Sequence, residues 1–418
     1  MTAPPTSLDD ALILPSAYRE QGRPVSEWEW LLRNDPIHWT EAEGREPFWA
    51  ITRHRDVSEV AHQPGLFSSE AGGIMVLTEV ELGSRRPEGE DLTGMRIIIT
   101  MDPPDHRTFR KVAAGYFSPR NIKSLTQVIE TTAQGIVAEL ATHGDEPVDF
   151  LETVAERHPV RVLCTILGVP RDQEDELLYI TEHLFDREDN SLSREEQAKA
   201  EADLGARVLE LFSAIIADRR ENPRADLATL LATAVLENGE PMGMAETLGY
   251  YLIVFTAGHD TTKYALAGGV AAFLDNPGEW RRLRENRSLI NPAVEEIVRF
   301  TAPVNYSGRT AMADCEIGGV PIHKGDRLAL YFGAANRDPE VFSNPQVFNI
   351  GRDPNRHLGF GWSEHFCLGA HLARSSLSAV IGVLAERIES MEAAGSPSFA
   401  PASLVHGYRS LPIRVHWV

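Results

Sequence analysis

The stretch FGWSEHFCLGAHLAR, at residues 360–374, places a cysteine between a glycine-bearing turn and a helical pattern. Cys367 stands just before that helix, where free backbone N–H groups and the helix dipole favour a thiolate. Gly361 and Gly369 allow the backbone to approach a flat cofactor closely, and the apolar Phe360 would limit access of water to the sulfur. Taken alone, the segment also fits a buried cysteine in a glycine-containing loop, so the ligand role needs support from other motifs.

The remaining cysteines offer no partner for Cys367. Cys164 and Cys315 lie far from it in the sequence, and the chain contains no CxxC pair. This spacing argues against a disulfide framework or a structural zinc site and fits a reducing cytoplasm. Cys164, within RVLCTILGV, is best interpreted as a small buried hydrophobe.

Composition excludes several classes of protein. The formal net charge is -21 over 418 residues, which opposes binding to nucleic acid or to an anionic membrane. The N-terminus is acidic and proline-rich and has no basic leader followed by an apolar run, so we expect no export signal. The apolar runs are shorter than the ~20 residues that a membrane helix needs. We therefore expect a soluble, cytoplasmic, globular protein that is a monomer.

Periodicity indicates a mostly α fold with small β-sheets. Amphipathic helical patterns and short strand-like segments both occur, and no internal repeat or linker divides the chain. The predicted helices include 128–144, 207–222 and 248–274, and the predicted strands lie within 49–53, 315–332 and 410–418. Gly318 and Gly319 predict a hairpin turn. We expect one domain, residues 1–418, with a long irregular segment at 334–362 of the kind that is usually functional.

The predicted helix at 248–274 contains the run Ala257-Gly258-His259-Asp260-Thr261-Thr262. A glycine costs about 1 kcal/mol relative to alanine in a helix interior, so its presence needs a reason. Small residues would let a ligand lie against the backbone, and a threonine can bond the carbonyl four residues earlier and open the helix locally. A groove for dioxygen is one interpretation. A packing glycine beside solvent-facing Asp260 and Thr261 explains the pattern equally well.

The cysteine segment resembles the haem-binding loop of the cytochrome P450 family, in which a Phe-Gly pair, a His, the Cys and a Gly recur. The matching positions are Phe360, Gly361, His365, Cys367 and Gly369. The resemblance implies the triangular, mostly α cytochrome P450 fold, one non-covalent haem b, and Cys367 as the proximal iron ligand. One position departs from the family pattern: Ser363 stands where most members have a second glycine, and the acidic Glu364 follows it. If that position needs an unusual backbone dihedral, Ser363 is strained by about 1 kcal/mol.

The glycine-containing helix is similar to the distal-helix motif of the same family. The resemblance implies that Ala257 and Gly258 adjoin the haem and that Asp260 and Thr261 form a catalytic acid–alcohol pair. Dioxygen cleavage consumes protons, which must reach the site through positioned groups without flooding it with water. Thr261 would hold the oxygen-bound network and Asp260 would gate the protons, while His259 has no assigned role.

Two further sets of residues match the family. Glu296 and Arg299 have the spacing of its Glu-x-x-Arg motif, which supports the cysteine loop. Many members have an arginine as a third partner, but Val347 occupies that place here. The third partner is therefore missing or is supplied by another residue, for example Arg352. The resemblance also implies four groups that hold the haem propionates. These groups are His106, Arg110, Arg309 and His365.

The resemblance implies a substrate pocket formed by the distal helix, by residues after the Glu-x-x-Arg helix and by parts of 72–97. The predicted pocket residues are Ile253, Thr256, Ala257, Val304 and Asn305. The sequence looks closest to terpene-hydroxylating members of the soluble, ferredoxin-dependent bacterial class. A small apolar terpene or terpenoid is therefore the expected substrate, with a steroid or an aromatic hydrocarbon as the alternative.

The expected activity is that of a monooxygenase that inserts oxygen from O2 into an unactivated C–H bond. No flavin or nicotinamide motif is present, so electrons would come from an iron–sulfur ferredoxin with its NAD(P)H-dependent reductase, docked on a basic patch that includes Arg107, Lys111 and Arg374. Two other classes of protein remain open. A peroxygenase would use peroxide and lack the Asp260–Thr261 pair, and a non-enzymatic haem-thiolate sensor would need neither proton relay nor pocket.

Overall fold

A computed structural model describes residues 8–78, 96–185 and 194–418. The N-terminal half of the described chain contains α1 (Leu8–Ile13), α2 (Pro15–Gln21), α3 (Val25–Asn34), α4 (His54–Ala61), α6 (Asp105–Ala114), α7 (Pro119–Ser124), α8 (Thr126–Ala141), α9 (Arg157–Leu167) and α10 (Glu174–Phe185). The C-terminal half contains α11 (Arg194–Glu221), α12 (Leu227–Ala232), α13 (Met244–Asp275), α14 (Pro277–Glu285), α15 (Ile290–Thr301), α16 (Phe332–Ala335) and α17 (Ala370–Arg387). These helices dominate the fold, as the sequence predicted.

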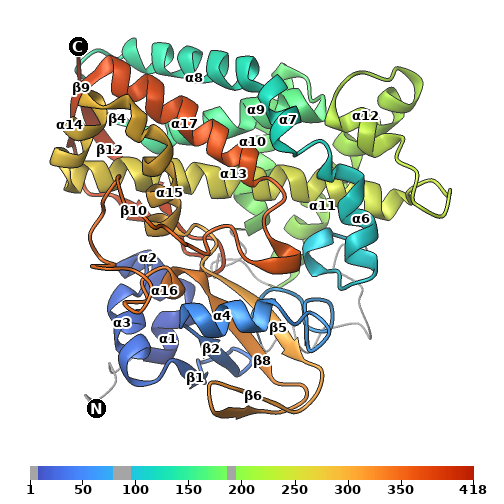
Figure 1. Cartoon of the computed structure of the whole chain (residues 1–418). Coiled ribbons are helices and arrows are strands. Elements are labelled where there is room, and N and C mark those ends of the chain that lie inside the picture. The colour runs from blue at the N-terminus through green and yellow to red at the C-terminus, as the bar shows by residue number, and fades with distance from the viewer. Residues whose placement is uncertain (1–7, 79–95, 186–193) are drawn as a thin grey trace.

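The strands are short and form small sheets at one side and at the end of the helical layer (Figure 1). They are β1 (Ile37–Thr40), β2 (Phe48–Ile51), β3 (Phe67–Ser68), β4 (Val148–Asp149), β5 (Tyr306–Ala311), β6 (Cys315–Ile317), β7 (Val320–Ile322), β8 (Arg327–Tyr331), β9 (Ile388–Ala393), β10 (Ser398–Phe399), β11 (Tyr408–Ser410) and β12 (Pro412–Trp417). The predicted hairpin at Gly318 and Gly319 is confirmed by the antiparallel pairing of β6 with β7.

The largest sheet has five strands in the order β1-β2-β8-β5-β3. Its β2 and β8 are parallel, with Trp49 opposite Leu328, while β8 and β5 are antiparallel, with Arg309 opposite Leu328. The sheet therefore brings Arg309, late in the chain, next to strands formed by its first quarter.

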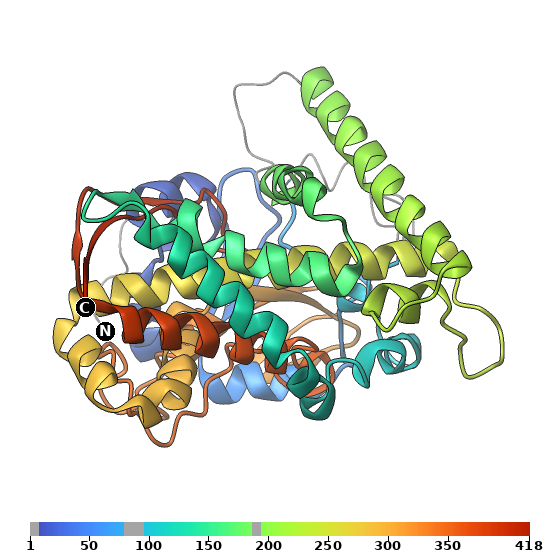
Figure 2. The same cartoon turned by 90° about the horizontal axis from the view of Figure 1, so that it is seen from above.

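Helix α13 is the central element of the helical layer. It spans 32 residues, is apolar on almost all sides, and packs against α9, α11, α12, α14, α15 and α17. A helix that is hydrophobic around its whole circumference must be buried, and α13 contributes to both of the large hydrophobic clusters. Figure 2 shows α13 crossing the molecule, with α17 and α8 alongside one end and α11 extending outward near the other.

Helix α17 begins at Ala370, directly after the cysteine segment, and packs against α8, α13 and α15. Its buried face, which includes Leu377, Val380, Ile381 and Leu384, belongs to the same hydrophobic cluster as the C-terminal half of α13. Cys367 is therefore attached at short range to the interior of the protein. No helix in the described ranges combines the length and apolarity needed to cross a bilayer.

Candidate active site

The cysteine loop, residues 358–369, is a compact turn closed by its own backbone. The N–H of Gly361 donates to the carbonyl of Leu358 at 2.8 Å, and the N–H of Cys367 donates to the carbonyl of Phe360 at the same distance. Gly361 has a φ of 69°, in the left-handed region that glycine adopts without steric cost. These contacts fix the position of Cys367 relative to Phe360, as a ligand loop requires.

Ser363 has a φ of 59°, so a non-glycine residue occupies the left-handed region within the cysteine loop. It begins the short 3₁₀ turn Ser363–His365, which ends with Phe366 N–H bonded to the Ser363 carbonyl at 3.0 Å. The position therefore has the backbone dihedral that makes glycine favourable, and a serine there is strained by roughly 1 kcal/mol.

The Cys367 side chain is only partly exposed. Burial raises the pKa of the Cys367 thiol, while the Gly369 N–H and the guanidinium groups of Arg110 and Arg374 act in the opposite direction. The predicted stabilisation of a thiolate by the start of the following helix is thus present but is outweighed by burial in the protein alone. A bound metal ion would add positive charge that favours the thiolate.

Helix α6 brings two of the predicted propionate partners to the cysteine loop. His106 is fully buried, and neither of its ring nitrogens has a hydrogen-bond partner among the described residues. Arg110, one turn later, donates to the carbonyl of Phe366. Burial lowers the pKa of His106, with a further contribution from the positive charge of Arg110.

The other two predicted partners complete a cluster of nitrogen donors. The His365 ring lies 4.3 Å from that of His106, centroid to centroid, and its Nε2 is 3.2 Å from Ser69 Oγ. Arg309 is 5% exposed, and none of the ion pairs formed among the described residues involves it. Burial lowers the pKa of Arg309 to about 10, and Arg309 in turn contributes to the low pKa of His365, whose main cause is burial.

This arrangement fits an acidic, flat cofactor. A buried guanidinium without a carboxylate and a buried imidazole without a hydrogen bond are costly unless a ligand supplies acceptors. Two ionised carboxylates would satisfy Arg309, Arg110 and His106, and a partly exposed sulfur lies in the same loop as His365. The donors thus match the carboxylates and iron of a haem.

One face of α13 within the predicted distal motif is accessible. Ala257 is exposed and Thr261, four residues later, is half-buried, while the intervening His259 and Asp260 are buried. The Thr261 hydroxyl donates to the Ala257 carbonyl at 2.6 Å, so the helix has the predicted i−4 side-chain bond. Gly258 faces α9: a Cβ there would meet the Leu163 side chain at 2.9 Å, so packing explains this glycine.

The Asp260 carboxylate belongs to a buried polar cluster. Its Oδ1 lies 2.6 Å from Lys263 Nζ and 3.2 Å from His259 Nδ1, and His259 Nε2 lies 3.2 Å from the Glu156 carbonyl. Burial alone would raise the pKa of Asp260, but Lys263 and His259 outweigh it and hold that pKa at about 2. Sequence reasoning missed Lys263 and gave His259 no role, although the i, i+3 spacing of Asp260 and Lys263 was a usable signal.

The predicted pocket residues differ in burial and in the element that carries them. Ile253 and Thr256 are buried on α13, and the Thr256 hydroxyl donates to the Leu252 carbonyl. Val304 is half-buried and pairs with Val405 in an isolated bridge. Of the predicted stretch 72–97, residues 79–95 lie outside the described residues.

The Asn305 side chain contacts segments that are distant in the sequence. Its side chain is fully buried, and its amide donates to the Tyr18 hydroxyl and to the Ser403 carbonyl. A Cβ on Gly333 would lie 3.0 Å from Asn305 Oδ1, so the amide is also enclosed by α16. These contacts let Asn305 link the N-terminal helices to the C-terminal loop, and its place in the substrate pocket stays a prediction.

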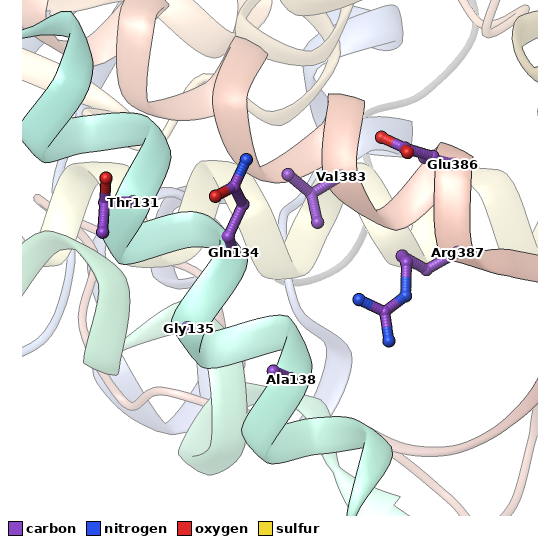
Figure 3. A pocket seen from close by; sticks show the side chains of 7 residues that line it. All are labelled: Thr131, Gln134, Gly135, Ala138, Val383, Glu386 and Arg387. Carbon is purple, nitrogen blue, oxygen red and sulfur yellow. The ribbon is translucent and has the colours of Figure 1, made fainter.

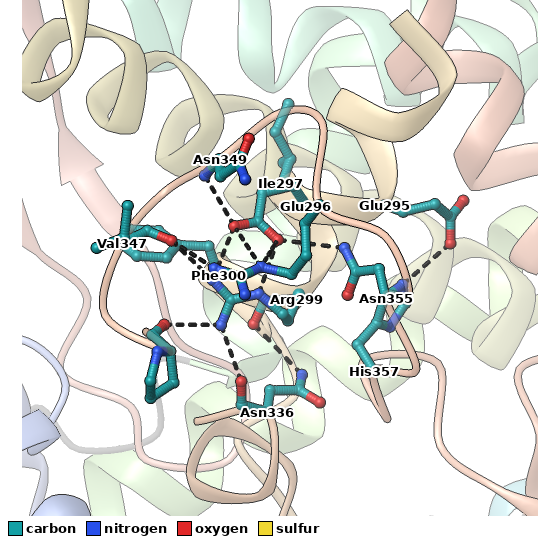
Figure 4. Close-up of polar contacts among 12 residues, drawn as sticks. Glu295, Glu296, Ile297, Arg299, Phe300, Asn336, Val347, Asn349, Asn355 and His357 are labelled. Carbon is teal, nitrogen blue, oxygen red and sulfur yellow. Dashed lines mark hydrogen bonds and ion pairs between the residues drawn. The ribbon is translucent and has the colours of Figure 1, made fainter. Parts of the chain in front are cut away.

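The Glu-x-x-Arg pair lies at the centre of a buried network (Figure 4). Arg299 donates from Nε and Nη2 to the Glu296 carboxylate at 2.7 and 2.8 Å, and from Nη1 to the carbonyls of Asn336 and Pro345. Arg352 supplies the third partner: its Nε lies 3.0 Å from Glu296 Oε2, and its other nitrogens bond the carbonyls of Ser343, Asn344 and Val347. The irregular segment that leads to the cysteine loop is thus fixed through its backbone.

The three cations of the predicted basic patch are all paired within the chain. Arg107 bonds Glu364, Lys111 Nζ lies 2.6 Å from Glu237, and Arg374 donates two hydrogen bonds to Glu295. The patch therefore has much less net positive charge than the sequence suggested. Of these three ion pairs, Lys111–Glu237 is the one in which both side chains are about two-thirds exposed.

A separate surface groove lies between α8 and α17 (Figure 3). It is lined by Thr131, Gln134, Gly135, Ala138, Val383, Glu386 and Arg387. Val383 is 13 residues along α17 from its start at Ala370, which corresponds to about 20 Å from the cysteine loop. The groove contains none of the residues discussed above.

Comparisons with known proteins match nearly the full length of the chain. The family model described as "Cytochrome P450" matches residues 39–389. Cytochrome P450-terp from a Pseudomonas species is 35% identical, covering 98% of this chain and 97% of the relative, and linalool 8-monooxygenase from Pseudomonas putida is 33% identical, covering 92% and 93%. The crystal structure of CYP108D1 from Novosphingobium aromaticivorans superimposes with a TM-score of 0.89 at 31% identity, covering all of both chains.

Proposed function

This chain belongs to the cytochrome P450 family and is a haem-dependent monooxygenase, and we propose that its substrate is a small apolar terpene or terpenoid. The observation that supports this substrate class is the match along nearly the full length to a relative named for oxidation of linalool, at 33% identity. The accessible face of α13, with Ala257 and Thr261, supports a binding site that is apolar except for one hydroxyl.

In this proposal Cys367 is the iron ligand and four donors hold the propionates. His106, Arg110, Arg309 and His365 would bind the two carboxylates, which explains why Arg309 is buried and forms no ion pair with an acid of the described ranges. Phe360 and Gly361 close the loop around the sulfur, since the Phe360 carbonyl accepts from the Cys367 N–H. Bound haem supplies the iron that activates dioxygen, and thiolate donation favours O–O cleavage.

Protons are proposed to pass through Asp260 and Thr261. Thr261 can turn its hydroxyl from the Ala257 carbonyl, 2.6 Å away, towards a ligand on the accessible face of the helix. Asp260 is ionised and bonded to Lys263, so it can take a proton from the surroundings only if that contact rearranges. Because Asp260 is buried and Thr261 lies on the accessible face of the helix, the rate of proton delivery from the interior to the ligand would depend on these two side chains.

The test of this relay is the coupling of electron use to product. We expect Thr261→Ala to keep substrate binding and to divert most of the consumed electrons to peroxide or water. Thr262→Ala is the matched control, because Thr262 is the buried neighbour on another face of α13. Unchanged coupling in Thr261→Ala would remove the proton-relay assignment.

Electrons are proposed to come from an iron–sulfur ferredoxin with an NAD(P)H-dependent reductase, in the cytoplasm. Lys111 is the best candidate contact, because an exposed ion pair is worth little and a partner carboxylate could replace Glu237. We expect Lys111→Glu to slow reduction by the ferredoxin at low ionic strength by several-fold. Lys324→Glu, an equal change of charge in the β7–β8 turn, should leave the rate unchanged; equal slowing in both variants would point to net charge alone. Arg374 is a poorer probe than sequence reasoning suggested, because its pair with Glu295 is only 31% and 30% exposed, so Arg374→Glu would bring two partly buried carboxylates together.

Substrate class is tested by the spin-state change of the haem iron on binding. Terpenes, steroids and aromatic hydrocarbons should be compared at equal concentration, followed by product analysis with a ferredoxin system and with peroxide alone. We expect the tightest binding and product formation with a terpene or terpenoid and the ferredoxin system. Tighter binding of a steroid would refute the substrate proposal, and product with peroxide alone would favour a peroxygenase.

A further inference from the structure

Helix α6 contacts the cysteine loop at two points that are one helical turn apart. Arg107 Nε donates to Glu364 Oε1 at 3.0 Å, with a second bond from Nη2, and Arg110 donates to the carbonyl of Phe366. We call these four residues the α6–loop clasp. His365 lies between Glu364 and Phe366 in the sequence, and Phe366 directly precedes Cys367. A shift of α6 would therefore also move the Cys367 sulfur.

The clasp also places a pair of opposite charges beside the haem-binding donors. Glu364 Oε2 lies 3.8 Å from His106 Nδ1, and His106 contacts His365. The Glu364 side chain is 22% exposed and that of Arg107 is 63% exposed. The guanidinium of Arg107 holds the pKa of Glu364 below its usual range, so the carboxylate is ionised at neutral pH.

The two charges act on the iron in opposite directions. A carboxylate near a redox centre favours the oxidised, more positive state and lowers the reduction potential, whereas a guanidinium raises it. Because Glu364 is the less exposed of the two, solvent screens its charge less than that of Arg107. The pair should therefore act on the potential as a small net negative charge.

We propose that Glu364 and Arg107 are positioning residues that set the reduction potential of the haem iron, Glu364 by lowering it and Arg107 by offsetting most of that effect. This inference rests on the proposed binding of haem at Cys367. It gives a function to Glu364, a charged residue in the loop that the ligand role of Cys367 does not explain.

The experiment is an equilibrium redox titration of the purified haem protein, followed by its visible spectrum. Glu364→Gln should raise the potential, Arg107→Gln should lower it, and the double variant should lie between the two and near the wild type. Glu364→Asp and Arg107→Lys keep the charges and should stay close to the wild-type potential. The matched controls are Arg282→Gln and Glu279→Gln. These two side chains form an ion pair on α14, at the far end of the molecule from α6 in Figure 1, and are 46% and 22% exposed.

Each outcome bears on the proposal. Shifts of Glu364→Gln and Arg107→Gln in the same direction, or haem loss from both with retention in the double variant, would mean that the pair only holds the loop and would overturn it. Equal shifts in the α14 variants would reduce the effect to net charge and would also overturn it. The spectrum of the wild-type ferrous carbon monoxide complex is the separate check: absence of a thiolate signature would refute haem ligation by Cys367 itself.

Discussion

The ammonium of Lys263 lies 2.6 Å from Oδ1 of Asp260, and the two side chains are only 7% and 6% exposed. Removal of one partner leaves the other as an unpaired buried charge, which typically costs 3–5 kcal/mol. We therefore expect Lys263→Met to lower the free energy of unfolding by about 3 kcal/mol, as measured by denaturant titration. The double variant Asp260→Asn, Lys263→Met should recover part of that loss, and strictly additive losses would contradict the coupling.

The same contact predicts a kinetic effect. Asp260→Asn removes the ionisable group while keeping its shape, so proton delivery should become the slow step of turnover. We expect turnover to fall by about tenfold to a thousandfold, within the usual range for loss of a general acid–base group. The solvent deuterium isotope effect should increase as well. A slower rate with an unchanged isotope effect would assign Asp260 to structure alone.

Ser363 provides a test of backbone strain. Its φ of 59° is acceptable for glycine and unfavourable for serine. Ser363→Gly should therefore stabilise the haem-free protein by up to about 1 kcal/mol, although greater freedom of glycine in the unfolded chain offsets part of the gain. Ser363→Ala keeps the Cβ and should give no gain, so equal stabilisation by both changes would show that the hydroxyl, and not the dihedral, is unfavourable.

Arg352 should be as important for stability as Arg299. It bonds Glu296 and three backbone carbonyls, and its side chain is 8% exposed. Arg352→Ala would remove the arginine bonds to the Ser343 and Asn344 carbonyls and one of the two cations beside the buried Glu296, so we expect a loss of at least about 2 kcal/mol and faster loss of haem. Arg356→Ala, an exposed arginine of the same segment, is the control and should be close to neutral.

His158 predicts how stability depends on pH. Its side chain is fully buried, and burial lowers the pKa of His158 to about 4 in the folded protein. The unfolded state, with an ordinary pKa near 6.5, binds a proton first as the pH falls, so stability decreases between pH 6.5 and 4. The shift corresponds to about 3 kcal/mol. His158→Gln should flatten this dependence in unfolding measurements, whereas the exposed His143→Gln should not.

Sequence patterns predicted the elements that depend on local chemistry. The three helices and the Gly318–Gly319 hairpin were identifiable because their periodicity and turn residues lie within one segment. Arg352 was identifiable as a replacement for the missing arginine because the network needs a cation there and few candidates lie nearby. The left-handed dihedral at Ser363 was likewise expected from the glycine that other members have at that position.

Contacts between distant segments were not predictable in this way. The pairing of Arg107 with Glu364 joins residues 257 positions apart, and the enclosure of Asn305 by Tyr18 joins residues 287 positions apart. Side-chain type alone does not specify such partners. For this reason the sequence overestimated the charge of the basic patch, since the acids that pair with its three cations are identified only in the folded chain.

The parallel pairing of β2 with β8 also has a consequence for biosynthesis. Strand β2 is made early, but Arg309 and the partner Leu328 follow it by more than 250 residues, and Cys367 comes later still. Contacts between such distant segments form slowly, and before they form, the surfaces of β2 remain without their neighbours. Cys367 follows β8 in the chain, so the cysteine that is proposed to ligate the haem is made only after the strand that covers β2.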